Sequence, residues 1–351
     1  VGMASIVGID IGARSIRAAE VSGATGARPT LVRFAEVAIA SSAVRSGEIH
    51  DAAAVTEALR QLWRAGKFAS KHVMLGIGHQ RVFAREFELP RITPVQMKQS
   101  LQFYVQDALP MPVADAVLDF VPLHEGIGQN GPFISGLLVA APKAGVLTLV
   151  EAARAAKLDP IGVDLNAFAL ARTAGRATEL TGTVVIVDIG EATTSIVITL
   201  DGIPQFVRLV PMGGGDITSA IDARLDVGER AAEAAKRAIG YTSMPPTASA
   251  EQIAASESLN RVAGELATTI RNTVQFYLSS QGAGGAVSLL LSGGGSRLGG
   301  LERSLHEYMR VDVTSLDVAS SIVLAKSAGT LEAAQWDSAS VAIGLALGAK
   351  R

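Results

Sequence analysis

The chain has 351 residues, of which 48% are hydrophobic and 18% charged, and its formal net charge is −2. This length allows two domains with full cores, and the composition excludes a disordered protein. The charge and the lack of a basic run make nucleic acid an unexpected partner. The absence of cysteine excludes disulfides and thiolate metal sites, and no apolar run reaches the roughly 18 residues of a membrane span.

The first predicted element is an apolar strand that ends in an Asp-Ile-Gly turn. Its residues run from Ile6 to Asp10, Gly12 follows, and Ser15 begins a second strand. The rest of this half is expected to hold strands at 31–39, 73–77 and 161–165 and helices at 52–63 and 167–176.

Residues 82–158 interrupt this half with a small α+β unit. Its predicted order is strand, helix, strand, strand, helix, at 83–89, 94–109, 117–123, 134–140 and 146–156, with a Gly-rich turn between the last two strands. Pro94 suits the first turn of its first helix. Phe103 and Tyr104 are expected to pack in the core of this unit.

A second Asp-Ile-Gly hairpin begins the other half of the chain, at residues 184–202. Asp188 and Gly190 end a strand of β-branched residues, and Thr193 precedes the next strand. A glycine allows a ligand to approach the backbone, and successive N–H groups and hydroxyls can hold phosphate oxygens. An aspartate beside a phosphate requires a cation between them, so the pattern indicates Mg²⁺ held through waters.

The two hairpins share one pattern: an apolar strand, Asp-Ile-Gly, two residues, a hydroxyl and a second apolar strand. Taken alone, each is also compatible with an ordinary surface turn. Two copies in the two halves predict a duplicated domain with a ligand between the copies.

The second half continues with glycine-rich junctions between strands and helices. A strand at 206–210 leads to Gly213, Gly214 and Gly215, whose N–H groups are expected to face an anion. The prediction continues with a helix at 222–239, an exposed loop at 244–258 and a helix at 259–279. It ends with a strand at 287–291, a glycine loop with a helix to 309, and a last helix at 340–349. The late loop does not fit the dinucleotide fingerprint, because Leu298 occupies the third glycine position.

Together these motifs resemble the actin-like ATPase superfamily, which includes actin, MreB, FtsA, the large heat-shock chaperones and the sugar kinases. The resemblance implies an α/β, ribonuclease H-like duplicated two-domain fold with an FtsA/PilM-type 1C insert. It implies domain 1 (1A) at 1–81, 159–182 and 331–351, the inserted subdomain 1C at 82–158, and domain 2 at 183–330, with 2B at about 218–285.

The resemblance also assigns site residues, with ATP and Mg²⁺ as cofactors. Asp10 and Asp188 are the metal and catalytic carboxylates. The segment ERAAEAAKRAIG resembles the helix whose Glu and Lys face the nucleoside. The cofactor-binding set is Asp10, Gly12, Ser15, Asp188, Gly190, Thr193, Thr194, Gly213, Gly214, Gly215, Glu233, Lys236, Gly293, Gly294, Gly295 and Ser296.

Within the superfamily, the insert resembles that of the PilM family of type IV pilus assembly proteins. The matching stretches are Leu89-Pro90, LPMPVADAVLDFVPL, LLVAAPKAGV and DLNAFALARTA. The resemblance implies an ATP-binding scaffold, cytoplasmic at the inner face of the membrane, which binds the N-terminal peptide of a PilN-like membrane protein. Other inner-membrane complex and motor proteins are implied partners, without direct membrane insertion. The peptide groove is expected between the insert and the first domain, with walls at 82–89 and 97–108.

Hydrolysis is expected to be slow, because Asn166 occupies the position of the water-orienting glutamate of hydrolysing relatives. Asp164 and Thr193 are alternative residues for holding the water, and Asn166 is also suited to cap the following helix. A small-metabolite kinase, an FtsA-like filament protein and a type II secretion relative are the alternative functions. FtsA proteins continue into an amphipathic helix, which is not seen before Arg351.

Overall fold

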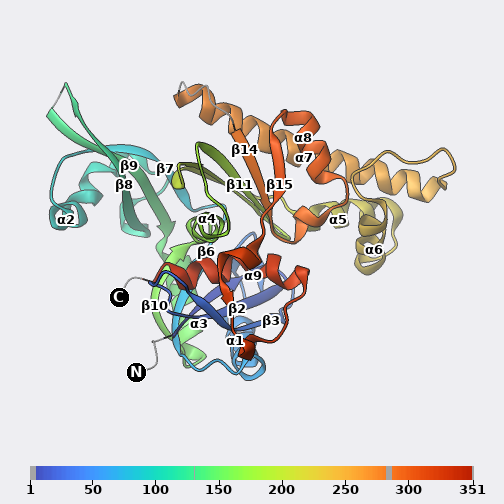
Figure 1. The fold of residues 1–351 in the computed structure, drawn as a ribbon, viewed down its shortest axis with the longest axis horizontal. Coiled ribbons are helices and arrows are strands. Elements are labelled where there is room, and N and C mark those ends of the chain that lie inside the picture. Colours follow the sequence, from blue (N-terminus) through green and yellow to red (C-terminus); the bar gives the residue numbers. More distant parts are fainter. Residues whose placement is uncertain (1–4, 130, 282–286, 350–351) are drawn as a thin grey trace.

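Two β-sheets with helices between and outside them form the body of the molecule in this computed structural model, which describes residues 5–129, 131–281 and 287–349. Figure 1 shows the layers from bottom to top: helices α1 and α3, the first sheet, helices α4 and α9, the second sheet, and helices α7 and α8. We call the two halves the first and second lobes, each built around one sheet.

The first sheet has six strands in the order β10-β6-β1-β2-β3-β16. Helix α1 (Ala52–Gly66) covers its outer face through Val55, Leu59 and Leu62, which are fully buried. The strands are β1 (Ser5–Ile11), β2 (Ser15–Ser22), β3 (Thr30–Ala38), β6 (His72–Ile77), β10 (Asp159–Leu165) and β16 (Val323–Leu324), and a small hairpin adds β4 (Val44–Arg45) and β5 (Glu48–Ile49).

The second sheet has five strands in the order β13-β12-β11-β14-β15 and repeats the arrangement of the first. In each sheet the strand before the Asp-Ile-Gly turn pairs antiparallel with the next strand and parallel with a later one. This shared topology supports the predicted duplication. The strands are β11 (Thr183–Ile189), β12 (Thr194–Leu200), β13 (Ile203–Val210), β14 (Val287–Ser292) and β15 (Asp312–Ser315).

Helices α4 (Asn166–Ala177) and α9 (Ala333–Leu347) are packed between the two sheets. Alternate residues of β11 face opposite cores: Val184 and Ile186 face α4, whereas Val185 and Val187 face helix α7. Burial on both faces explains the uninterrupted β-branched run of this strand. The two helices cross closely at Gly344, where a Cβ would lie 1.9 Å from the carbonyl oxygen of Ala169.

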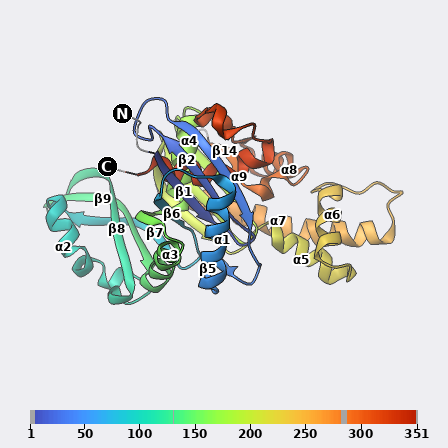
Figure 2. The same cartoon turned by 90° about the horizontal axis from the view of Figure 1, so that it is seen from below.

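The insert contains the predicted order of elements: β7 (Phe83–Pro90), α2 (Pro94–Tyr104), β8 (Ala116–Gly128), β9 (Gly131–Pro142) and α3 (Lys143–Ala155). Its sheet has the order β7-β9-β8. Figure 2 shows α3 beside α1, with which it shares the core of the first lobe. Strand β7 also contacts β13, so the insert touches both lobes.

Three predictions for the insert are wrong. Helix α2 ends at Tyr104 rather than at 109, and a short 3-10 turn at Gln106–Ala108 follows it. Phe103 is 66% and Tyr104 43% exposed, so neither lies in the core. Buried Leu101 and Val105 fill that core instead. The Gly-rich turn is also shorter than expected, because β8 and β9 continue to Gly128 and Gly131; residue 130 lies outside the described residues.

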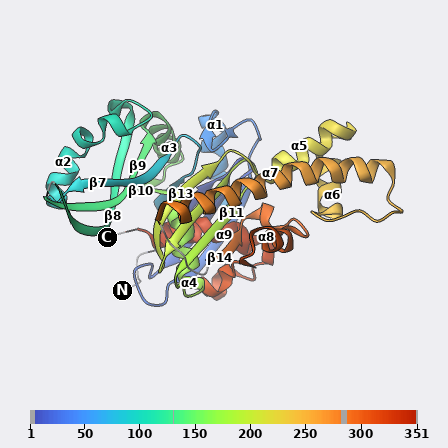
Figure 3. The same cartoon turned by 90° about the horizontal axis from the view of Figure 1, so that it is seen from above.

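The helices of the second lobe differ from the prediction at two points. The single helix expected at 222–239 is two helices, α5 (Gly214–Leu225) and α6 (Glu229–Ile239), separated where Asp226 and Gly228 have positive φ angles. The loop expected at 244–258 becomes helical at 250, because α7 spans Ala250–Gln281. Figure 3 shows α5, α6 and the first half of α7 as an arm that extends from the body.

The remaining elements lie in the insert and at or after the glycine loop at 293–295. They are the short 3-10 helix Gly294–Arg297, α8 (Leu301–Met309), and 3-10 turns at Val113–Asp115, Val318–Ser321 and Lys326–Ala328. Within the ranges given above, no helix combines the length and the apolar character that crossing a membrane requires.

Candidate functional site

The two Asp-Ile-Gly turns lie on opposite sides of one cavity between the lobes. The cavity has a volume of about 730 Å³, which is within the range of small-ligand sites. Residues of both turns, of the 293–295 loop and of α5, α6 and α9 line it. The amides of Ala13, Arg14, Glu191 and Ala192, at the tips of the turns, donate no hydrogen bond within the described parts of the chain. Free amides at such turns suit an anion.

Most of the predicted site residues line this cavity, and four do not. Thr194 is fully buried, and its hydroxyl donates to the carbonyl of Met212 at 2.8 Å. Ser296 donates to the carbonyl of Gly293 at 2.7 Å. Gly213 and Gly215 are also outside the lining. The predicted residues that line it are Asp10, Gly12, Ser15, Asn166, Asp188, Gly190, Thr193, Gly214, Glu233, Lys236, Gly293, Gly294 and Gly295.

The first aspartate has a cation opposite it. The antiparallel register places Asp10 across from Arg17, and Arg17 across from Glu36. Arg17 donates to Asp10 at 3.1 Å and to Glu36 at 2.9 Å. Glu36 also accepts from the Ser15 hydroxyl at 2.5 Å. The negative charge of Asp10 is therefore balanced by Arg17. Asp10, Arg17 and Glu36 form a hydrogen-bonded row across β1, β2 and β3.

The second aspartate has no such partner, because the register places Asp188 across from Ser195. Burial, followed by the nearby charge of Asp10, raises the pKa of Asp188 to about 6, against the opposing effects of Arg17 and a hydrogen bond from Ser292. Among the described residues, Asp188 is thus the carboxylate of the pair that forms no ion pair. A divalent cation between the two turns would supply a counter-charge.

Asn166 is the first residue of α4 and does not cap it, since no side-chain hydrogen bond closes the start of this helix. Its amide nitrogen donates to Asp10 at 3.2 Å, and its buried amide oxygen has no hydrogen-bond partner among the described residues. Asp164 is outside the cavity lining and is bonded to Arg172 of α4. In this structure the alternative water-holding residue Asp164 is therefore directed away from the cavity.

Gly213, Gly214 and Gly215 brace the second turn rather than offering their amides to the cavity. The amide of Gly214 donates to the carbonyl of Gly190, and that of Gly215 to the carbonyl of Glu191, both at 2.8 Å. Gly213 donates to Asp216 at 2.7 Å. A Cβ on Gly213 would lie 2.5 Å from both turn carbonyls, so glycine permits this close approach. The expectation that these amides face an anion does not hold in this conformation.

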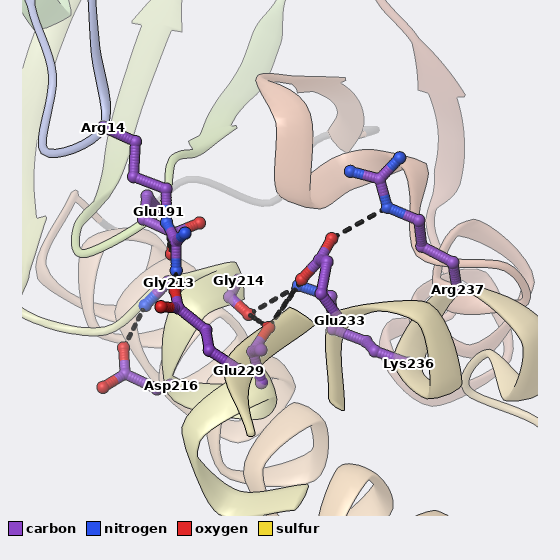
Figure 4. A network of polar contacts seen from close by, with 10 residues as sticks. Arg14, Glu191, Gly213, Gly214, Asp216, Glu229, Glu233, Lys236 and Arg237 are labelled. Atoms are coloured by element: carbon purple, nitrogen blue, oxygen red, sulfur yellow. Dashed lines mark hydrogen bonds and ion pairs between the residues drawn. The ribbon is translucent and has the colours of Figure 1, made fainter. Parts of the chain in front are cut away.

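Glu233 and Lys236 of α6 form a tight polar cluster at the other end of the cavity (Figure 4). Lys236, only 9% exposed, donates to Glu233 at 2.6 Å, to Thr218 at 2.8 Å and to the carbonyl of Gly214 at 2.9 Å. Although burial opposes the shift, hydrogen bonds from Lys236, Thr218 and Arg237 lower the pKa of Glu233 to about 2. Glu233 is thus a permanent anion at neutral pH.

The loop at 293–295 passes directly over Asp188. Gly293 has a φ of +83°, and a Cβ there would lie 2.7 Å from an oxygen of Asp188. Gly294 differs, because a Cβ on it would have no atom within 4 Å. A side chain at 294 would therefore project into open space at the edge of the cavity that Gly294 lines.

The sequence prediction missed seven charged residues that line the cavity: Arg14, Arg17, Glu36, Glu191, Arg237, Arg297 and Asp337. A signal for Arg17 was present, since the tight hairpin that follows Asp10 pairs Asp10 with Arg17. Nothing in the described residues groups three or more His, Asp or Glu side chains as a metal cluster. Two aspartates on facing turns still fit Mg²⁺, which commonly binds one or two carboxylates together with waters and phosphates.

Comparisons with known proteins agree with this architecture. A family model described as "Type IV pilus assembly protein PilM" matches residues 8–350. A solved "PilM-PilN type IV pilus biogenesis complex" superposes with a TM-score of 0.82 and 25% identity over 97% of each chain. The ethanolamine utilization protein EutJ from Carboxydothermus hydrogenoformans matches with TM-score 0.58 and 14% identity, covering 99% of this chain and 90% of that one. MreB5 of Spiroplasma citri bound to AMPPNP matches with a TM-score of 0.53 and 13% identity, covering 90% of this chain and 93% of that one.

Proposed function

The chain belongs to the PilM family of type IV pilus assembly proteins, and on that premise we propose that it is a nucleotide-controlled scaffold that binds Mg-ATP in its cleft and a PilN-like membrane protein through its insert. Its fold is the actin-like ATPase fold with a 1C-type insert, as the sequence predicted. The family match does not favour the alternatives of a small-metabolite kinase or an FtsA-like filament protein.

One observation carries the nucleotide proposal: two aspartate turns with free amides at their tips face each other across one cavity. Asp10 and Asp188 would hold Mg²⁺ through its waters, and the turns at Gly12 and Gly190 would hold the phosphates. The bound Mg²⁺ would supply the positive charge that separates Asp188 from the phosphates. Gly293, Gly294, Gly295, Glu233 and Lys236 would surround the nucleoside.

ATP is proposed to act mainly as a bound state, with slow turnover. Asn166 is engaged with Asp10 through its amide nitrogen, and an amide cannot accept a proton from water. Loss of a general base typically lowers the reaction rate 10²–10⁴-fold. Steady-state turnover at saturating Mg-ATP is therefore expected far below the usual enzyme median of about 10 s⁻¹. Turnover in that ordinary range would contradict this part of the proposal.

The insert is proposed as the surface for the partner peptide. It is built on the first lobe through α3. The open groove proposed here, of about 1020 Å³, lies within the insert between α2 and β8 rather than between the insert and the first domain, and residues 82–89, one of the two walls expected from the sequence, are not among its lining residues. Met97, Leu118 and Phe120 are among its lining residues, with the Arg91–Glu125 ion pair at its rim. The similar solved structure of the PilM-PilN type IV pilus biogenesis complex supports this assignment. Binding to a membrane-anchored partner would place the protein at the inner face of the cytoplasmic membrane, beside other inner-membrane complex and motor proteins.

Hydrogen–deuterium exchange with a synthetic N-terminal peptide of a PilN-like protein tests the partner assignment. Protection is expected within residues 82–108 when the peptide is added, and a scrambled peptide of the same composition is the control. Met97→Glu, which introduces a charge into the apolar lining, reports on the α2–β8 groove, and Val95→Glu is its matched control because Val95 is 68% exposed and outside the lining. Protection confined to the second lobe would contradict the assignment.

A further inference from the structure

Arg14 lies at the tip of the first turn, between Gly12 and Ser15, and lines the cavity. Its guanidinium forms ion pairs with Glu191, at the tip of the second turn, and with Glu229, the first residue of α6. Figure 4 shows Arg14 extending toward both glutamates. One side chain of the first lobe therefore joins the phosphate-type turn and the helical arm of the second lobe across the mouth of the cavity.

The other cationic side chains that line the cavity are less available to a phosphate. Arg17 lies between Asp10 and Glu36 with its side chain 25% exposed. Lys236 is buried among three acceptors, and Arg237 pairs with Glu233 at the nucleoside end. Arg297 pairs with Asp337 of α9 at 2.5 Å. Among the lining cations of the described residues, Arg14 alone stands at the tip of a turn.

The two ion pairs of Arg14 are weak enough to be exchanged. The side chains of Arg14, Glu191 and Glu229 are 46%, 30% and 57% exposed. Exposed pairs of this kind contribute little to stability, because water screens their attraction. A triphosphate carries several negative charges and accepts the parallel hydrogen bonds of a guanidinium. A triphosphate would therefore compete well for Arg14 against the separate carboxylates of Glu191 and Glu229.

We propose that Arg14 is an exchangeable latch: it ties the lobes together through Glu191 and Glu229 without nucleotide, and it transfers to the terminal phosphate when a nucleoside triphosphate binds. The inference rests on the proposed nucleotide function and deepens it. It assigns Arg14 the discrimination between tri-, di- and monophosphates. Release of Glu229 would at the same time free the start of α6 from the first lobe.

Calorimetric titrations of ATP, ADP and AMP into the full chain test this proposal. Arg14→Ala is expected to weaken ATP binding roughly ten- to hundredfold, the loss of a charge-assisted hydrogen-bonding partner, to weaken ADP binding less, and to leave AMP binding unchanged. Arg14→Lys should restore part of the ATP affinity. Glu229→Gln should tighten ATP binding roughly two- to fivefold, because it removes a competing carboxylate.

Arg230→Ala is the matched control, since it removes one positive charge beside Glu229 at an exposed position outside the cavity lining. Unchanged ATP affinity in Arg14→Ala, or an equal change for all three nucleotides, would overturn the inference while leaving the nucleotide function intact. Failure of the unmodified protein to bind any of the three would overturn the proposed function and the inference with it. Circular dichroism of each variant checks that it is folded.

Discussion

Two aspartates in the same sequence motif have different chemistry because of one residue opposite each. Asp10 faces Arg17 and forms an ion pair with it, whereas Asp188 faces Ser195 and has no ion-pair partner among the described residues. The Asp-Ile-Gly pattern predicted both turns but treated the two carboxylates as equivalent. The difference follows from the antiparallel register of each hairpin. This register can be derived from the sequence of a tight hairpin, but the Asp-Ile-Gly motif alone does not contain it.

Asp188→Asn is predicted to stabilise the protein without ligand. The raised pKa of Asp188, about 6, means that ionisation is disfavoured in the folded state. Stability is therefore lost as pH rises from about 4 through about 6, and an uncharged isostere avoids that loss. Urea unfolding at pH 7 should show a gain of up to about 3 kcal/mol, at about 1.4 kcal/mol per pKa unit, and the gain should vanish at about pH 3, below the ordinary pKa of 3.8.

Asp10→Asn serves as the control for that experiment and has the opposite expected sign. Asp10 forms an ion pair with Arg17 and accepts a hydrogen bond from Asn166. Removing its charge weakens this network and should lower the free energy of unfolding by about 1–3 kcal/mol. If both variants lowered the free energy of unfolding at pH 7, the account of an uncompensated Asp188 would be wrong.

Glu233 predicts an acid-sensitive contribution to stability. Its pKa of about 2 lies below the ordinary value of 4.5, so its stabilising effect is complete above about pH 4.5 and is lost as pH falls toward 2. The difference in unfolding free energy between the unmodified protein and Glu233→Gln should therefore be constant from pH 7 to 5.5 and shrink at pH 3.5. Glu251→Gln, on the exposed face of α7, is the control. A difference that persists undiminished at pH 3.5 would contradict the assignment.

At the scale of elements, the longer strands were predictable, whereas the short strands β4, β5, β15 and β16 were missed and the helix boundaries were less accurate. The β-branched run of β11 and the hairpin turns followed from local pattern. The start of α7 was missed, although Ser249 and Gln252 form reciprocal capping bonds there, at 3.2 and 2.9 Å. The bracing role of Gly213 was not readable, because it depends on turn carbonyls that approach from another hairpin. Glycine in a sequence marks close approach but does not identify the approaching group.

The crossing of α4 and α9 is predicted to tolerate no side chain at Gly344. A Cβ there would lie 1.9 Å from the Ala169 carbonyl, so Gly344→Ala must push the helices apart. Overpacking of this kind typically costs about 1–3 kcal/mol. The control is Gly175→Ala on α4, where the Cβ would meet a side-chain carbon at 3.6 Å. That variant should be neutral or gain up to about 1 kcal/mol from helix propensity. Similar thermal midpoints for the two variants would contradict the crossing.

At the scale of the molecule, the insert is the element through which the cleft and a partner can influence each other. It shares the core of the first lobe through α3 and contacts the second lobe where β7 meets β13. A change in the angle between the lobes would therefore alter the surroundings of β7. Coupling between two sites must be reciprocal in free energy.

The factor by which saturating Mg-ATP changes the affinity for the PilN-like peptide is predicted to equal the factor by which the peptide changes the affinity for Mg-ATP. Fluorescence anisotropy of a labelled peptide and calorimetry of the nucleotide give the two factors. A typical coupling of about 1–3 kcal/mol corresponds to roughly 5- to 150-fold. Peptide affinity that is the same with and without Mg-ATP would show that the insert does not sense the cleft.

Calorimetric binding of Mg-ATP to Gly294→Val, beside the unmodified protein, tests the central claim most directly. Position 294 lines the cavity, and a Cβ there meets nothing within 4 Å, so the variant is expected to fold normally. Its side chain would occupy space that the nucleotide needs. The account predicts one Mg-ATP site in the unmodified protein and its loss in the folded variant. Equal affinity in the two proteins, or no binding by the unmodified protein, would contradict it.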